Sequence, residues 1–224
     1  MKKFFLIWTV CLLSGMVAVA QDYEDEPQMR TVFSGPEVSS LGGYGALDVG
    51  YTSIDGLDAL LLGARGAVVV NHSLALGLGG KAFISQTVYD SYLQNDYEYI
   101  GGYGGFIFEP IIKWDQPVHL SIPVLIGAGG IGYLRHWGDY ENDFEDEYSD
   151  EDSYAFFVLE PGVEVEFNLV SWMRVAVYGS YRLTSNVKLD YKDAVTDVNA
   201  PSSIASPDLL RGFNAGLIFK FGKF

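Results

Sequence analysis

The sequence is poor in cysteine, histidine and basic residues. Its 224 residues include one Cys, at position 11, and three His. One cysteine cannot form a disulfide within the chain or supply a multi-cysteine zinc site. There are 14 Lys and Arg residues against 29 Asp and Glu, so the formal charge is −15. A chain this acidic is repelled by nucleic acid, and we expect no nucleic-acid partner.

Long apolar runs are also missing beyond the first 20 residues, which argues against membrane-spanning helices. Glycine and aromatic residues are plentiful, with 26 Gly, 15 Tyr and 14 Phe, and 49% of the chain is hydrophobic. That apolar content argues against intrinsic disorder. Gly and β-branched residues take the place of the Ala, Leu, Glu and Lys that are typical of helical proteins. The length suits one domain.

The first 38 residues look like an export segment and a tail. Lys2 and Lys3 precede an apolar run over 4–17, and Ala18-Val19-Ala20 forms a small-residue cleavage pattern. We therefore expect a secretory signal peptide over 1–20. A transmembrane anchor is the alternative, but the run is short for a span. The polar residues 21–38 are expected to form a periplasmic N-terminal tail.

From about residue 40 onward, apolar and polar residues alternate. This period of two predicts strands with one apolar and one polar face. A soluble β-sandwich also alternates, but with shorter strands and fewer charges at mid-strand. Strands of ten or more residues match the roughly 9–11 needed to cross a bilayer obliquely. The pattern covers eight segments, at 41–52, 59–71, 74–89, 97–112, 118–135, 154–168, 173–185 and 209–224.

The connections alternate in length along the chain. Short turns are expected at 71–73, 113–117 and 169–171, and longer connections at 53–58, 90–97, 136–153 and 186–208. Short periplasmic turns and longer external loops are typical of outer-membrane barrels. We predict an all-β fold, an eight-stranded antiparallel up-and-down transmembrane β-barrel over 39–224. Its location would be the outer membrane of a Gram-negative bacterium.

Three stretches carry a family resemblance. They are LLLGARGAVVVNHSLALGLGGKAF (60–83), GGYGGFIFEPIIKWDQPVHLSIPVLIGAGGIGY (101–133) and LEPGVEVEFNLVSWMRVAVYGSYR (159–182), with RGFNAGLIFKFGKF (211–224) as a closing strand. Together they resemble uncharacterised small outer-membrane β-barrels of Bacteroidetes, similar in architecture to the OmpA/OmpX type. The resemblance implies the barrel and its location. It brings no assigned activity and no functional residues. Phe224 fits the terminal Phe of such proteins but is one residue out of phase with Phe221.

The predicted interior face carries equal numbers of acidic and basic residues. An eight-stranded barrel is just wide enough for side chains to fill it. Balanced charges favour a buried network over an ion-selective pore, which would show an excess of one sign. The turn around Val170 is expected to place Glu166 opposite Arg174. The predicted network comprises Asp48, Glu109, Glu160, Glu164 and Glu166 with Arg65, Lys81, Arg174, Arg182 and Lys220.

One group of residues suggests catalysis. His119 and Ser121 face inward on one strand, and the short turn at 113–117 brings Glu109 almost opposite them. A Glu that orients a His, which in turn activates a Ser, is the logic of acyl hydrolysis. A lipid A-modifying acyl hydrolase is therefore one alternative function. The expected position near the periplasmic end and the inward orientation favour a polar cluster that satisfies its own hydrogen bonds.

Two further motifs are ambiguous. Residues 139–152 hold nine acids in fourteen positions, and a calcium site would use Asp139, Glu141, Asp143, Glu145, Asp146 and Glu147. Their spacing does not match an EF-hand, and a solvated, self-repelling loop is the simpler interpretation. The glycines of 127–132 match G-x-G-x-x-G, but a strand continues where a nucleotide site requires a helix.

The favoured function is structural or interactive. We expect a barrel closed by its own side chains, without cofactor, in contact with outer-membrane lipid and lipopolysaccharide. The loops 136–153 and 186–208 would contact any surface ligand. The alternatives are the lipid A hydrolase and a narrow pore.

Overall fold

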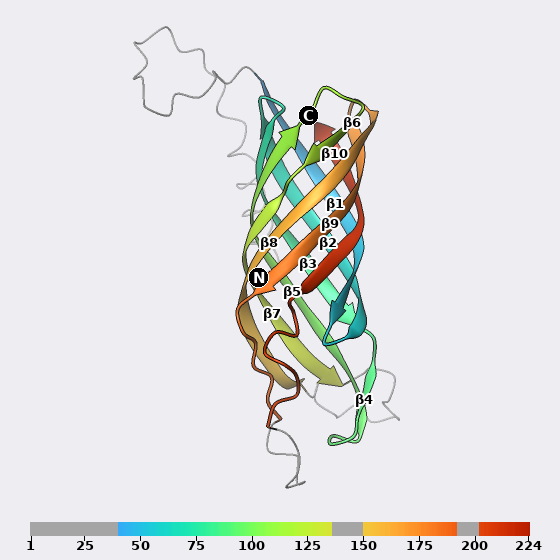
Figure 1. The fold of residues 1–224 in the computed structure, drawn as a ribbon, viewed down its shortest axis with the longest axis vertical. Coiled ribbons are helices and arrows are strands. Elements are labelled where there is room, and N and C mark those ends of the chain that lie inside the picture. Colours follow the sequence, from blue (N-terminus) through green and yellow to red (C-terminus); the bar gives the residue numbers. More distant parts are fainter. Residues whose placement is uncertain (1–39, 136–149, 192–201) are drawn as a thin grey trace, which may run out of the picture. The chain divides into compact units, whose positions relative to one another are not determined.

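The structure is a computed structural model that describes residues 40–135, 150–191 and 202–224 (Figure 1). The predicted signal peptide and tail, and most of the loop 136–153, lie outside the described residues. No helix among the described residues is long and apolar enough to cross a membrane. The strands are β1 (Leu41–Ile54), β2 (Leu57–Val70), β3 (Leu74–Ser85), β4 (Val88–Asp90), β5 (Asn95–Ile112), β6 (Val118–Ser121), β7 (Val124–Arg135), β8 (Asp150–Val170), β9 (Met173–Thr184) and β10 (Gly212–Lys223).

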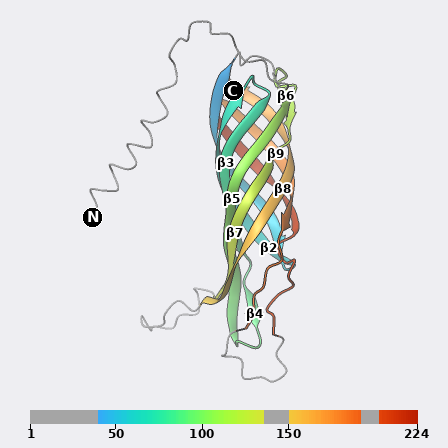
Figure 2. The same ribbon diagram turned by 90° about the vertical axis from the view of Figure 1, so that its left-hand side faces the viewer.

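The strands form one closed antiparallel sheet. Sequence neighbours pair with each other, and β1 pairs with β10 to complete the ring. β6 and β7 both pair with β5 on one side and β8 on the other, so the two together count as one strand of the ring. The short β4 pairs with the start of β5, beyond the end of β3. The ring therefore has eight strands, as the alternating pattern predicted. Figure 2 shows the crossing strands tilted steeply around the barrel.

Two predicted segments are interrupted, and one predicted loop is a tight turn. The segment 118–135 breaks at Ile122 and Pro123, where proline has no N–H for the ladder. The segment 74–89 ends at Ser85 and resumes as β4. The connection expected over 53–58 is a two-residue turn, with Asp55 at φ 51° and Gly56 at φ 79°. These positive φ values suit a tight hairpin whose twist matches the strands.

The outward face of the barrel is apolar. Phe106 is 74% exposed, Phe157 75% and Phe213 77%, values that place these rings on the outer surface of the wall. Leu47, Leu62 and other aliphatic side chains at alternate positions extend this surface around the ring. Because successive side chains of a strand point to opposite faces, the same strands deliver their polar residues to the interior.

The two ends of the barrel differ. We call one the turn end, because Asn71–Ser73, Lys113–Pro117 and Ser171–Trp172 connect strands there. The other is the loop end, which carries β4, residues 185–191 and residues 202–211. An apolar cluster fills the interior near the loop end, and polar side chains fill most of the remainder.

Phe224 closes the turn end, which accounts for its phase. Lys220 and Ile218 of β10 point inward, and Phe224 keeps their even-numbered phase. Its ring stacks on Tyr44 with centroids 5.8 Å apart, and the Arg174 guanidinium carbon lies 3.9 Å from its centroid. The β1–β10 register runs without a shift, so a bulge is not the cause of the phase. Phe221 faces outward, whereas Phe224 faces in.

Candidate functional site

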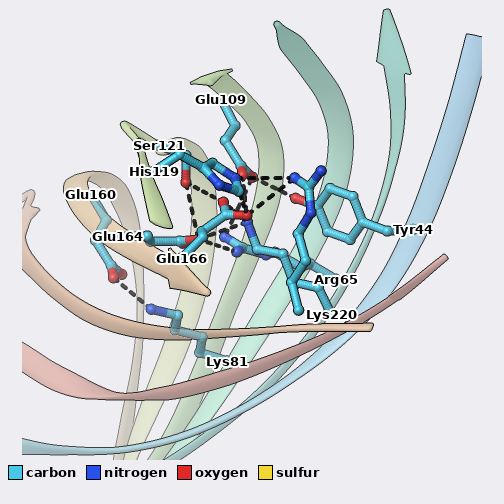
Figure 3. Close-up of polar contacts among 11 residues, drawn as sticks. Tyr44, Arg65, Lys81, Glu109, His119, Ser121, Glu160, Glu164, Glu166 and Lys220 are labelled. Atoms are coloured by element: carbon cyan, nitrogen blue, oxygen red, sulfur yellow. Dashed lines mark hydrogen bonds and ion pairs between the residues drawn. The ribbon is translucent and has the colours of Figure 1, made fainter. Parts of the chain in front are cut away.

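The interior holds a cluster of three carboxylates around one lysine, which we call the lower cluster, although Figure 3 draws it above the contact between Glu160 and Lys81. The Nζ of Lys220 lies 2.5 Å from Glu109, 2.8 Å from Glu164 and 2.6 Å from Glu166. All four side chains are almost completely buried. Glu109 comes from β5, which lies opposite β10 in the ring, so this contact crosses the barrel, whereas Glu164 and Glu166 come from β8, two strands from β10.

Two arginines balance the remaining charge of the lower cluster. Arg65 lies 2.7 Å from Glu164 and 3.8 Å from Glu109, and Arg174 lies 3.3 Å from Glu166. Three carboxylates thus face three permanent cations. Buried ions that lack partners cost several kcal/mol each, so this equality is a condition for the cluster to exist in the interior. The Tyr44 hydroxyl also donates to Glu109.

His119 and Ser121 are brought to Glu166 rather than to Glu109. The Ser121 Oγ donates to Glu166 at 2.6 Å, and the His119 Nε2 lies 3.1 Å from the other oxygen of Glu166. The pairing of β6 with β8 explains this, because it sets His119 directly opposite Glu166. Glu109 instead accepts from Tyr44 and Lys220. The hydroxyl and imidazole therefore share one carboxylate that also contacts Lys220.

This arrangement differs from a nucleophile–base relay. In such a relay the imidazole contacts the serine hydroxyl and takes its proton, and the carboxylate orients the imidazole. Here the serine donates directly to the carboxylate, which Lys220 and Arg174 already hold. His119 is 3% exposed and Ser121 0%, so neither side chain meets solvent or the outer wall. The geometry suits a hydrogen-bonded interior cluster.

The register predicted between Glu166 and Arg174 is wrong by two residues. Arg174 pairs with Asn168, and Glu166 pairs with Ala176. The hairpin turns at Ser171 and Trp172 rather than at Val170, and the register shifts between Asn168 and Val170. The long arginine side chain still reaches Glu166, so the predicted contact forms without the predicted pairing.

A second set of contacts, the upper cluster, lies toward the loop end. Glu160 is its centre. Its carboxylate lies 2.7 Å from Lys81 and accepts from Ser180 at 2.6 Å and from Tyr103 at 2.5 Å. The amide of Asn214 donates to Ser180. Lys81 also lies 4.7 Å from the centroid of the Tyr178 ring. Alternation alone indicated the inward direction of these side chains.

Asp48 and Arg182 complete the predicted interior set. Arg182 is fully buried; its Nε donates to the Leu210 carbonyl at 2.6 Å and its Nη2 to Thr52. Asp48 is 7% exposed and faces a small cavity of about 40 Å³ that Arg65, Lys81 and Tyr178 also line. All ten residues of the predicted set therefore point into the barrel: eight lie in the two clusters, Asp48 lines the cavity between them, and Arg182 contacts Leu210 and Thr52.

The loop end is closed by residues of the predicted loop 186–208 and by the first residues of the predicted strand 209–224, where β10 begins only at Gly212. Val187, Leu189 and Leu210 are at most 1% exposed and pack on the aromatic side chains of the apolar cluster. Within that cluster the rings of Tyr97 and Tyr133 stack with centroids 4.8 Å apart. A signal was available, because polar and apolar residues still alternate over Asn186–Asp190. The described part of the loop 186–208 thus continues the interior core.

The described residues offer one group with metal-ligand geometry. Oxygens of Glu109, Glu164 and Glu166 lie within 4.8 Å of one another. The ammonium of Lys220 contacts all three, so it takes the place a cation would occupy. The calcium site predicted from Asp139 to Glu147 lies outside the described residues and stays a prediction.

Comparison with known proteins supports the fold. No protein-family model matches the chain, and no curated protein matches it. The crystal structure of Neisserial surface protein A (NspA) is similar, with a TM-score of 0.50 and 9% sequence identity. The alignment covers 82% of this chain and 97% of NspA. At that identity the similarity concerns the fold alone.

Proposed function

We propose that the protein is an outer-membrane barrel of a Gram-negative bacterium, with a filled, non-conducting interior and a structural or surface-interaction role in the cell envelope. The outer wall supports the location, because its exposed side chains are large and apolar around the whole ring. An eight-stranded barrel with an apolar outer band is suited to a lipid environment. The similarity to a Neisserial surface protein agrees with this proposal.

The filled interior is the single observation that supports a barrel that does not conduct ions. The lower cluster crosses the barrel from Lys220 of β10 to Glu109 of β5, and Lys220 and its three carboxylates are at most 1% exposed. Beyond the upper cluster, Leu189 and Leu210 pack across the loop end. A pore requires a continuous aqueous path, and two buried layers across the described interior support a barrel that does not conduct ions.

Cysteine labelling tests the location and orientation. The only cysteine of the sequence is Cys11, within the predicted signal peptide, so single substitutions give unique labels in the exported chain. We expect a membrane-impermeant maleimide to label Tyr89→Cys, at the loop end, in intact cells. Asp115→Cys, at the turn end, should react only after lysis. Phe106→Cys, on the outer wall, should react only with a lipid-soluble reagent. Equal labelling of Tyr89→Cys and Asp115→Cys in intact cells would contradict the proposal.

A complementation experiment separates the structural role from the interactive one. A strain lacking the protein is tested for detergent sensitivity and for adhesion to host or abiotic surfaces. It is complemented with the wild-type chain or with a chain whose acidic residues 139–147 are changed to Gly and Ser. Rescue of detergent resistance by both chains assigns a structural role to the barrel. Failure of the altered chain to restore adhesion assigns the interaction to the loop.

A further inference from the structure

Arg182 is a buried cation without a carboxylate partner among the described residues. Its side chain is 0% exposed and forms no ion pair in the described part of the chain, whereas each of the other four interior cations contacts at least one carboxylate. Its Nη1 is buried and has no hydrogen-bond partner within the described residues. A guanidinium is always charged, and a buried ion without a counter-ion costs several kcal/mol. Arg182 is therefore suited to bind an anion.

The surroundings of the Arg182 guanidinium are apolar. Its Cζ lies 5.5 Å from the centroid of the Phe83 ring and 5.7 Å from that of Tyr103, and both rings belong to the apolar cluster of the loop end. Thr184, the next inward side chain of β9 toward the loop end, has a buried hydroxyl without a hydrogen-bond partner in the described residues. A cation and a hydroxyl beside an apolar cluster are the groups that would bind the charged head of an apolar molecule.

Leu210 occupies the position beside the guanidinium. It belongs to residues 185–191 and 202–211, which we call the cap. The Nε of Arg182 donates to the Leu210 carbonyl oxygen at 2.6 Å. The Leu210 side chain is 0% exposed and packs in the apolar cluster together with Leu189 and Leu209. The cap thus presents an oxygen to the guanidinium and alkyl groups to the rings, as a molecule with one carboxylate and an alkyl tail would.

The backbone of the cap bonds mainly to itself. The Ile204 N–H donates to the Leu189 carbonyl at 2.7 Å, and the neighbouring strands of the ring end at Thr184 and begin at Gly212. The pairing of β10 with β1 and with β9 closes the ring without any cap residue. Segments whose backbone lies outside the ladder open locally at a low free-energy cost. The cap can therefore give way to a ligand while the ring stays closed.

We propose that the loop end binds a long-chain fatty acid, with its carboxylate on Arg182 and its tail among the rings of the apolar cluster, in place of Leu209 and Leu210. A single charge selects a monoanion, because Lys81 is already paired with Glu160. A carboxylate matches the planar fork of a guanidinium. The tail replaces the leucine side chains, so apolar surface stays buried. This activity goes beyond the proposed envelope role, and the lower cluster stays in place when the ligand binds.

Photo-cross-linking of the refolded barrel in lipid nanodiscs tests this proposal. The probe is palmitic acid with a diazirine near the end of its chain, and peptide mass spectrometry locates the attachment. We expect attachment within 97–103 or 131–133, whose buried side chains belong to the apolar cluster. An excess of palmitic acid, but not of its methyl ester, should prevent it. Attachment only at outward side chains such as Phe106 would overturn the proposal.

A charge variant tests the role of Arg182. Arg182→Gln should reduce the yield of interior attachment about tenfold, because hydrogen bonds to charged groups are the strong class. Lys188→Gln removes an exposed positive charge from the cap and should leave the yield unchanged. Only molecules that migrate as folded barrels in unheated gels are compared. Equal interior yields from Arg182→Gln and the wild type would overturn the proposal.

A cap variant keeps the proposal testable if Arg182→Gln does not fold. Leu210→Ala removes the alkyl group that competes with the fatty-acid tail, so the interior yield should rise several-fold at low probe concentration. Leu183→Ala, at a side chain that is 41% exposed, should leave the yield unchanged. An interior yield from Leu210→Ala that does not exceed the wild-type yield would overturn the proposal. Attachment that the methyl ester prevents as well as the acid would also overturn it, because the carboxylate would then play no part.

Discussion

The ammonium of Lys220 lies 2.6 Å from Glu166, and it contacts Glu109 and Glu164 as well. One side chain of β10 therefore holds a carboxylate of β5, across the barrel, and two carboxylates of β8, two strands away. These contacts connect non-adjacent strands, which the backbone ladder cannot do. The stability of the closed ring should depend on them.

Replacing Lys220 by Met should destabilise the barrel strongly. The variant keeps most of the side-chain volume but leaves three buried carboxylates with two cations. Removing one partner of a buried ion pair costs about 3–5 kcal/mol. We expect a loss of that size in the free energy of unfolding, measured by urea titration of the barrel in lipid vesicles. Lys223→Met, an exposed change on the same strand, should alter it by less than about 0.5 kcal/mol.

Lys220→Ala should convert the lower cluster into a cation site. Three carboxylates within 4.8 Å of one another would lose the ammonium between them, and such oxygens suit calcium. We expect the variant, refolded with millimolar calcium, to melt at a higher temperature than without it. In both proteins residues 139–147 are changed to Gly and Ser, so that the acidic loop cannot bind calcium. The protein that keeps Lys220 should then show no calcium-dependent shift in melting temperature. A variant indifferent to calcium would show that the carboxylates spread apart.

Leu210 should hold the cap at the loop end. It is fully buried in the apolar cluster, and truncating such a side chain costs about 2–5 kcal/mol when a cavity is left. We expect Leu210→Ala to lower the free energy of unfolding by that amount. Leu183→Ala removes the same atoms from a side chain that is 41% exposed, and it should have a much smaller effect. Equal losses would mean that the loop does not pack as the structure shows.

The hydrolase alternative predicts a change in lipid A mass. Because Ser121 donates to Glu166 and is buried, we expect the refolded barrel to leave lipid A intact. The test is mass spectrometry of lipid A after incubation with lipopolysaccharide. Loss of an acyl chain that the wild type causes and His119→Ala abolishes would contradict this expectation and establish an enzyme.

Most of the fold could be predicted from the sequence because alternation is a local property. The inward direction of each residue in the predicted network follows from its place in the alternation of side chains along a strand. The pairs Glu164 and Glu166, or Arg174 and Arg182, illustrate this. Tyr44 carried the same signal, since it lies between Gly43 and Gly45, but it was not chosen. Which segments form the strands of the barrel, and which face of each strand is polar, can thus be predicted without a structure.

The partners within the interior could not be predicted in the same way. Whether Ser121 meets Glu109 or Glu166 depends on how far adjacent strands are staggered, and the β8–β9 hairpin contains a register shift. Contacts across the barrel, such as Lys220 with Glu109, depend on the tilt of all eight strands together. Alternation along a strand gives the direction of a side chain, but neither its position along the barrel axis nor its contact partner.

The cap at the loop end was missed for a different reason. Val187 and Leu189 fall in the predicted loop 186–208, because strands were assigned only to longer alternating segments. Leu209 and Leu210 were predicted to begin the strand 209–224, but they form a turn and β10 begins only at Gly212. Their burial depends on the open mouth of the barrel beneath them, where Tyr97 and Tyr133 offer an apolar surface. That surface depends on the pairing of β5 with β7, which are far apart from Leu209 and Leu210 in the sequence.

Single-channel recording in a planar lipid bilayer tests the central claim, that side chains fill the barrel interior. The refolded protein is inserted in molar potassium chloride, with a general porin in a parallel membrane as the positive control. Native migration in unheated gels confirms that the inserted protein is folded. We predict a flat current at the baseline level. Regular, reproducible conductance steps from the folded protein would contradict a filled interior and establish a pore.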